Sequence, residues 1–153
     1  MESQDTPEFI QSLETRIQVL NYIIEIIKEI HLILDLNILL DATVNLIREH
    51  FFGDEFIFLY LLDETKRWAV GRAGTGEVGK IILARNHKVE INDSTLLGWS
   101  IHNRKARMVL DGEKEAENFD VPLKPLFPHC ECNVVFPLIS RDKVIGALEI
   151  YTW

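Results

Sequence analysis

The residue types that most readily carry chemistry meet in one short run near the carboxyl end, His129-Cys130-Glu131-Cys132. Thiolate, imidazole and carboxylate groups all bind zinc, but zinc sites usually take cysteines two to four residues apart and add a second cluster. Cys130 and Cys132 have one residue between them, and the other four histidines are scattered along the chain. Such cysteines more often pack as small apolar side chains. We therefore expect no metal site.

A redox reaction is the second chemistry that these cysteines suggest. A catalytic thiolate must be activated and held over its substrate, with a resolving partner in reach. Cys130 and Cys132 would point to opposite faces of a strand, so a disulfide between them would be strained. Two cysteines without a disulfide framework favour a reducing, cytoplasmic compartment, and the polar, acidic amino terminus is unlike a signal peptide. We expect the chain not to be an enzyme.

Binding to anionic partners is disfavoured by the charge of the chain. Gly74, Gly76 and Gly79 punctuate one loop, but no lysine-serine or lysine-threonine pair follows them, so a phosphate loop is not indicated. The net charge of −8 is spread along the chain and repels nucleic acid and anionic lipid surfaces. The most apolar run, 19–40, contains several charged residues, which excludes a membrane span.

A long amino-terminal helix is predicted from residue 7 to residue 34, after a disordered lead at 1–6. Thr6-Pro7-Glu8 has the hydroxyl cap, first-turn proline and early acid of a helix start. Apolar residues then recur at alternating steps of three and four, the spacing of a coiled-coil seam. The seam consists of Ile10, Leu13, Ile17, Leu20, Ile24 and Ile27, with His31 at its next position.

A second apolar stripe runs along the same helix and consists of Val19, Ile23, Ile26, Ile30 and Ile33. A helix that is apolar on two sides must be buried on two sides, so we expect one stripe to pack on its own domain and the seam to pair in a homodimer. The alternative is that both stripes pack inside one monomer. His31 would make the pairing sensitive to pH, since its unperturbed pKa is about 6.5, or would simply end the seam.

The remaining chain predicts an α+β fold with a central antiparallel sheet of five to six strands flanked by helices. A second helix should follow the cap Asp35 and end near Phe52-Gly53. Its inner face should consist of Leu36, Leu39, Leu40, Val44 and Ile47. Ser94 should cap a further helix over 95–103. The expected strands are 55–62, 67–72, 88–91, 107–110, 132–139 and 144–152, with a short helix over 80–84 and a long connection over 111–128.

Two residues of the closing hairpin have a specific structural explanation. Gly146 lacks a β-carbon, so another backbone or a ligand can approach its strand closely. Pro137 cannot donate a ladder hydrogen bond, so it should lie at a bulge or where its strand leaves its pairing. We expect both residues to act through structure and not through contact with a ligand.

Four segments, in this order, resemble those of a GAF domain. They are LDLNILLDATVNLI, EFIFLYLLDETKRWAVGRAG, LLGWSIHNRKARMVLD and CNVVFPLISRDKVIGALEIYT, which has a proline-leucine pair, a turn and an isoleucine-glycine pair. The resemblance covers about residues 35–152 and implies a GAF domain over 35–153. Such domains serve as small-molecule receptors or dimerising spacers in signalling proteins. They usually continue into a final helix, so the resemblance also implies that this chain is a fragment.

The resemblance implies a pocket between one sheet face and the loop-rich middle of the chain. The residues that it places there are Phe56, Phe58, Tyr60, Asn133, Val135, Glu149 and Tyr151, with Trp99 as a possible cover. Aromatic side chains with a few polar groups are typical of a site for a small ligand. The alternative is that the same side chains fill the interior and leave no room for a ligand.

The residues of this chain give little support to the known activities of the family. Relatives that reduce free methionine sulfoxide carry acids where this chain has Asn133, Glu149 and Tyr151, so one acid remains. Relatives that attach a bilin use a cysteine near the central helix, which here has none, and the signature for cyclic nucleotides is missing. We therefore expect a regulatory domain of a larger protein, with no cofactor, whose output domain is a kinase, a cyclase or a transcriptional activator.

Overall fold

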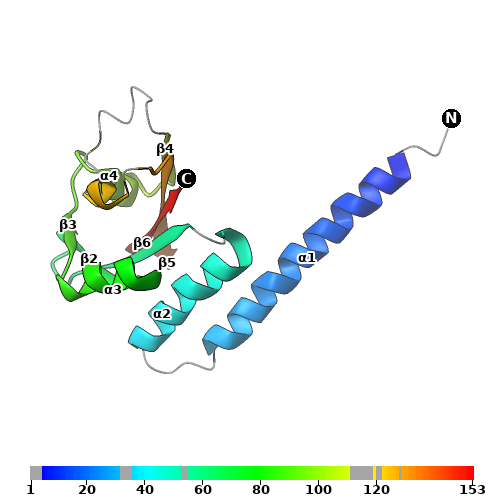
Figure 1. Ribbon diagram of the computed structural model, residues 1–153, viewed down its shortest axis with the longest axis horizontal. Helices are drawn as coiled ribbons and strands as arrows, with labels where there is room; N and C mark the ends of the chain where they lie inside the picture. The colour runs from blue at the N-terminus through cyan, green and yellow to red at the C-terminus, as the bar shows by residue number, and fades with distance from the viewer. Residues whose placement is uncertain (1–4, 32–35, 53–54, 111–118, 120–121, 128) are drawn as a thin grey trace.

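The computed structural model describes residues 5–31, 36–52, 55–110, 119, 122–127 and 129–153. Six strands form one antiparallel sheet in the order β3-β2-β1-β6-β5-β4 (Figure 1), which confirms the predicted α+β fold. The strands are β1 (Phe56–Leu62), β2 (Trp68–Gly74), β3 (Lys88–Glu90), β4 (Arg107–Leu110), β5 (Cys132–Ser140) and β6 (Lys143–Thr152). The helices are α1 (Asp5–His31), α2 (Leu36–Ile47), η1 (Arg48–Phe52), α3 (Gly76–Ala84), α4 (Leu96–Asn103) and η3 (Lys124–Leu126).

Strand β1 lies inside the sheet, between β2 and β6, and five consecutive residues, 56–60, are buried. A strand with both faces covered has apolar residues at every position, not at alternate ones, which is why its sequence has no polar alternation. Its two faces pack into different clusters, one containing Phe56, Phe58 and Tyr60 and the other containing Ile57 and Leu59. The prediction of a central strand is confirmed.

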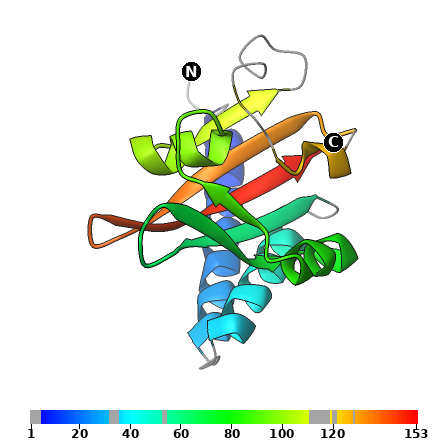
Figure 2. The same cartoon turned by 90° about the vertical axis from the view of Figure 1, so that its left-hand side faces the viewer.

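The two faces of the sheet are covered by different helices, as Figure 2 shows with α1 and α2 behind the sheet and α4 in front. On one face, Leu40 and Val44 of α2 pack on Ile57, Leu59 and Ile150. On the other face, Leu96, Leu97 and Ile101 of α4 pack on the aromatic side of β1, together with Ile82 of α3. The sheet is therefore the middle of three layers.

The closing hairpin agrees with the structural explanation of its two special residues. A β-carbon at Gly146 would lie 2.0 Å from the backbone oxygen of Tyr60, so only glycine lets β6 pair this closely with β1. Pro137 lies two residues beyond Val135, where the described pairing with β4 ends, and the register against β6 shifts between Leu138 and Ile139. Pro137 is still paired with Ala147 of β6, but it lies beyond the described pairing with β4, which agrees with a proline where its strand leaves one of its neighbours.

Several predicted boundaries were wrong by a few residues, and one cap was wrong. Thr95, not Ser94, caps α4: its side-chain oxygen accepts a hydrogen bond from the backbone N–H of Gly98 at 3.0 Å. The short helix begins at Gly76 because Thr75 already has extended cap geometry. Leu36 is exposed and does not belong to the inner face of α2. Asp35 and Gly53, the expected cap and stop of the second helix, lie outside the described residues.

Helix α1 contacts α2 near the carboxyl end of α1, and the amino-terminal part of α1 projects away from the sheet (Figure 1). Nine large apolar side chains of α1 are exposed, each over 38–64% of its surface; they are Phe9, Ile10, Leu13, Ile17, Val19, Leu20, Ile23, Ile24 and Ile27. Ile26 of the second stripe is buried, whereas the side chains of Ile30, His31 and Ile33 lie outside the described residues. No described helix is long and apolar enough to cross a membrane.

Candidate functional site

Seven of the eight residues predicted to line a pocket lie on one face of the sheet, where β1, β6 and β5 are neighbours. Phe56 is paired with Tyr151 and Phe58 with Glu149 across β1 and β6. Asn133 and Val135 are the partners of the same Tyr151 and Glu149 across β6 and β5. Directly opposed residues of paired strands share a face, so the alternation of three strands brings these side chains together.

The polar centre of this face is the carboxylate of Glu149, which is only 3% exposed. Tyr60 donates its hydroxyl to Oε2 at 3.0 Å, and Tyr151 donates its hydroxyl to Oε1 at 2.9 Å. Asn133 donates Nδ2 to Oε1 at 3.0 Å. These three hydrogen bonds compensate part of the free energy that the carboxylate loses when it leaves water for the apolar interior.

Burial changes the acidity of this cluster. Desolvation raises the pKa of Glu149 above its ordinary value, and the hydrogen bonds from Asn133, Tyr151 and Tyr60 oppose part of that rise. Desolvation, followed by the nearby charge of Glu149, holds the pKa of Tyr60 and of Tyr151 well above the ordinary tyrosine value. Both hydroxyls therefore stay protonated at neutral pH and remain donors to the carboxylate.

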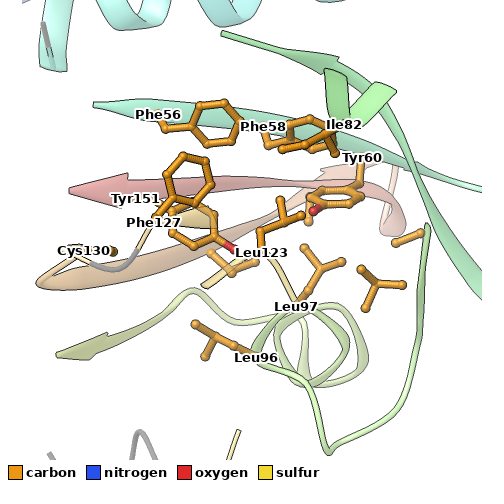
Figure 3. Close-up of a cluster of buried hydrophobic side chains, with 14 of the residues drawn as sticks. Phe56, Phe58, Tyr60, Ile82, Leu96, Leu97, Leu123, Phe127, Cys130 and Tyr151 are labelled. Atoms are coloured by element: carbon orange, nitrogen blue, oxygen red, sulfur yellow. The ribbon is translucent and has the colours of Figure 1, made fainter. Parts of the chain in front are cut away.

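The aromatic half of the face is closely packed, as Figure 3 shows. The ring of Phe127 lies 4.5 Å from that of Phe56 and 4.9 Å from that of Tyr151, measured between centroids. Leu123, from the same connection, is buried in the cluster beside Leu97 and Tyr60 (Figure 3). These contacts fill the end of the face next to Phe56 with the chain's own side chains.

Three buried polar atoms of the strands, α4 and the loop before β3 have hydrogen-bonding capacity that the described residues do not use. Asn133 Oδ1, Ser100 Oγ and His87 Nε2 are buried, and none of them has a hydrogen-bond partner within the described part of the chain. The ring of His87 lies 5.9 Å from that of Tyr60, and burial lowers the pKa of His87. Buried polar atoms without partners are costly, so a water or a small ligand beside any of these atoms would stabilise the fold.

Trp99, the eighth predicted residue, lies on α4 outside this cluster. Its half-buried ring packs edge-on against Phe119 at 6.3 Å, and the guanidinium of Arg107 lies 4.6 Å above it. The guanidinium also lies over the ring of Phe119, at 5.4 Å. Trp99 thus links α4, β4 and the following connection and does not line the face with Glu149.

The cysteines lie at the start of β5, where Cys130 is buried and Cys132 is half-buried. Cys130 donates its thiol to the backbone oxygen of Cys132 at 3.0 Å, so the two form no disulfide. Among the described residues, no three histidine, cysteine, aspartate or glutamate side chains come together in a group that would hold a metal ion. The geometry offers neither a paired thiol over the Glu149 cluster nor a zinc-like ligand set.

Three residues of the face were not anticipated from the sequence, namely His87, Leu123 and Phe127. Leu123 and Phe127 belong to the connection 111–128, which was interpreted as acidic and irregular. The available signal was the group of apolar residues Phe119, Val121, Leu123, Leu126 and Phe127, which follows the acidic first part of this proline-bearing stretch. Apolar side chains that recur in an irregular segment indicate that the segment packs against the interior of the protein.

Comparison with known proteins identifies the architecture. A family model described as "GAF domain" matches residues 34–153. No curated protein sequence matches the chain. The GAF domain of a phosphoenolpyruvate-protein phosphotransferase from Coxiella burnetii is similar in structure with a TM-score of 0.71 and 17% identity, over 87% of this chain and 76% of that chain.

Two further solved structures show the range of proteins with this architecture. The GAF domain of an Acinetobacter phosphoenolpyruvate-protein phosphotransferase has a TM-score of 0.67 and 20% identity, over 87% of this chain and 75% of that chain. Free methionine-R-sulfoxide reductase from Neisseria meningitidis, solved with its substrate, has a TM-score of 0.62 and 18% identity, over 83% of this chain and 68% of that chain. At these identities the similarity concerns the fold, and it includes both a domain of a larger protein and an enzyme.

Proposed function

The chain belongs to the GAF domain family, and from this premise we propose that it is the regulatory domain of a larger signal-transduction protein, paired as a homodimer through α1. The observation that carries the proposal is the apolar surface of α1, where the seam residues Ile17 and Leu20 are 56% and 58% exposed. An apolar stripe of this length on a helix requires a cover, and a second α1 supplies a matching one. The output domain is a kinase, a cyclase or a transcriptional activator.

The exposed area agrees with a dimer of ordinary size. The six seam residues Ile10, Leu13, Ile17, Leu20, Ile24 and Ile27 are each 38–58% exposed, and a paired α1 would cover all of them on both chains. The seam begins near Ile10 and ends near Ile27, so the area is continuous along the helix. A pairing of this size is expected to be stable at micromolar concentration.

Substitution within the seam tests the pairing. Leu20→Glu should raise the dimer dissociation constant at least about a hundredfold, because each protomer would have to bury a carboxylate in the apolar seam. Asn21→Glu adds the same charge beside the seam at another exposed residue of the helix and is the matched control. Light scattering and analytical ultracentrifugation of the full chain give the molar mass. A folded wild-type monomer at micromolar concentration would remove the proposal.

A small-molecule receptor role is the second part of the proposal, and the buried polar atoms near Glu149 support it. Asn133 Oδ1 needs a hydrogen-bond donor, and the carboxylate of Glu149 lies beside Asn133. A ligand for this face should therefore be small and rich in donors, such as an amine or an amino acid. The rival is a structural dimerisation module whose interior is filled, which the close packing of Phe127 on Phe56 favours.

Thermal unfolding of the dimer distinguishes a small-molecule receptor from a structural dimerisation module. The melting temperature is measured with panels of amino acids, amines, purines and fatty acids. Binding raises the melting temperature by an amount that depends on the ratio of free ligand to dissociation constant. Asn133→Leu should abolish the shift for a ligand that binds at this face, and Ile81→Ala on the exposed side of α3 should leave it unchanged. A panel without any shift supports the structural module.

Catalysis is not part of the proposal. The buried thiol of Cys130 donates to a backbone oxygen, and thiol catalysis requires an accessible thiolate. A protein with both Cys130→Ser and Cys132→Ser should therefore keep its fold and its dimerisation. Thiol-dependent reduction of free methionine sulfoxide by the wild type, lost in the double variant, would show instead that the chain is an enzyme.

A further inference from the structure

The seam of α1 is regular in the identity of its residues as well as in their spacing. In the usual lettering of the heptad, abcdefg, alternating steps of three and four residues place the seam at positions a and d. Position a consists of Ile10, Ile17 and Ile24, and position d consists of Leu13, Leu20 and Ile27. From residue 10 to residue 24, every a is therefore a β-branched isoleucine and every d is a leucine.

The separation of isoleucine from leucine has a consequence for the direction of a partner helix. In a parallel pair in register, each a meets the a of the other helix and each d meets its d, so there are two kinds of layer. β-branched residues at a with leucine at d favour two strands in parallel coiled coils. In an antiparallel pair each layer joins an a to a d, so all layers are alike and the separation of the two residue types would bring no advantage.

The contacts of α1 with its own domain lie on another side of the helix from the seam. Consecutive residues of an α-helix are turned by about 100° around its axis. The buried Ile26 therefore lies about 160° from Ile24, and so does Tyr22, whose ring contacts that of His50. The amino-terminal part of α1 projects away from the sheet (Figure 1). The described part of the domain thus leaves the seam open to a second helix.

The residues that flank the seam are compatible with a parallel pair. In such a pair, position g of one helix faces position e of the next heptad on the other helix. The facing residues are Phe9 with Glu14, Arg16 with Asn21, and Ile23 with Lys28. None of these pairs brings together two charges of the same sign, and the methylene groups of Lys28 can cover Ile23.

We propose that two copies of α1 pair in parallel and in register, as a two-stranded coiled coil with identical residues in each layer. The inference rests on the homodimer proposed above and adds the direction and the register of its helices. The twofold axis then runs along the helix pair, and both sheets lie at the carboxyl end of that pair. A shift of α2 against α1 in either protomer would therefore act on the same end of one coiled coil.

Disulfide formation measures the direction of the pair. In the full chain with Cys130→Ser and Cys132→Ser, Leu13→Cys supplies one cysteine at a d position. In a parallel pair the two copies of this cysteine meet with their Cα atoms about 6 Å apart, as in native disulfides. In an antiparallel pair over the same seam, residue 13 faces residue 24, and the two copies lie about 16 Å apart along the axis. A glutathione redox buffer should therefore link Leu13→Cys into a covalent dimer.

Two further proteins in the same background test the opposite direction and the specificity of the link. A mixture of Ile10→Cys and Ile27→Cys should form no mixed disulfide, because parallel pairing separates these residues by about 25 Å along the axis. An antiparallel pair would bring them together. Gln11→Cys is the matched control on another exposed side of the helix, and its yield of covalent dimer should be at least about tenfold lower than that of Leu13→Cys. Circular dichroism verifies that each variant is folded.

The outcomes separate this inference from the dimer proposal. A covalent dimer of Leu13→Cys without the mixed disulfide supports the inference. The mixed disulfide of Ile10→Cys with Ile27→Cys, without a covalent dimer of Leu13→Cys, shows an antiparallel pair and overturns the inference while pairing through α1 stands. A wild-type dimer that gives neither link overturns the inference and places the interface away from the seam. A folded wild-type monomer overturns both the inference and the dimer proposal.

Discussion

At the residue scale, Glu149 is the charged group with the strongest influence on its surroundings. Its carboxylate is buried and binds two hydroxyls and one amide. The same three side chains belong to β1, β5 and β6, so the cluster ties three neighbouring strands to one another. A charge in the interior also makes stability depend on pH.

The pH dependence of Glu149 has a definite sign. Burial raises its folded pKa above the ordinary value of 4.5, so between these two values the folded protein holds a proton that the unfolded chain lacks. Stability from this group is therefore present below pH 4.5 and is lost as pH rises through the folded pKa. Glu149→Gln removes this dependence, so the unfolding free energy of the wild type relative to the variant should fall by up to about 1.4 kcal/mol per pH unit in that window.

Urea unfolding of both proteins from pH 4 to pH 8 measures this difference. Because all other groups titrate in both proteins, the subtraction isolates Glu149. Parallel stability curves over the whole range would contradict a raised pKa for Glu149.

Gly146 is the residue whose replacement should harm the sheet most directly. In Gly146→Ala the new β-carbon would meet the backbone oxygen of Tyr60, which cannot rotate away as a side chain can. The unfolding free energy should fall by about 2–3 kcal/mol or more, as expected for overpacking against backbone. Ser140→Ala, at an exposed residue of the same hairpin, should change it by less than about 0.5 kcal/mol. Equal stability of both variants would show that β6 can shift at no cost.

At the element scale, the start of α4 depends on a single hydroxyl. Thr95 accepts from the N–H of Gly98 and is buried, whereas Ser94 is exposed and bonds to the side chain of Asn92. Thr95→Ala should lower the unfolding free energy by about 1–2 kcal/mol because it leaves a buried N–H of the helix without its acceptor. Ser94→Ala should have a smaller effect. Chemical denaturation of the two variants compares the caps, and a larger loss for Ser94→Ala would reverse the assignment.

Helix α1 differs from the other helices because most of its described apolar surface lies outside the core. Helices α2 and α4 bury their apolar sides on the sheet, so their positions follow from the fold of one chain. The position of α1 depends instead on its contact with α2 and on its partner. A small change in the sheet or in α2 would therefore alter the geometry of a paired α1, which is how a ligand with different affinities for two arrangements would act.

At the scale of the whole molecule, the domain should fold without α1. Of the large apolar residues in the described part of α1, Ile26 alone is buried, and Tyr22 makes a ring contact with His50 at 5.5 Å. A chain that begins at residue 34 should therefore remain folded, with a melting temperature lowered by several degrees, and should be monomeric. Circular dichroism and light scattering test both points. Loss of the folded sheet would show that α1 is part of the core, and a persistent dimer would place the interface elsewhere.

The sequence by itself determined the elements and their faces. Continuous apolar residues in 55–62 indicated a strand buried on both sides. The resemblance to a GAF domain implied that Phe56, Asn133 and Glu149 share one face. The helical spacing in α1 likewise predicted its two stripes. These features depend on neighbours in the chain, and local geometry is sufficient to predict them.

Only the tertiary structure decided which of those side chains meet and what surrounds them. Tyr60 donates to Glu149 from 89 residues away in the sequence, and the filling of the face by Leu123 and Phe127 depends on the path of an irregular connection. The choice of Thr95 over Ser94 as the cap likewise depends on packing between distant elements. Burial is a property of the assembled chain, and no local spacing encodes how far a helix extends over a sheet.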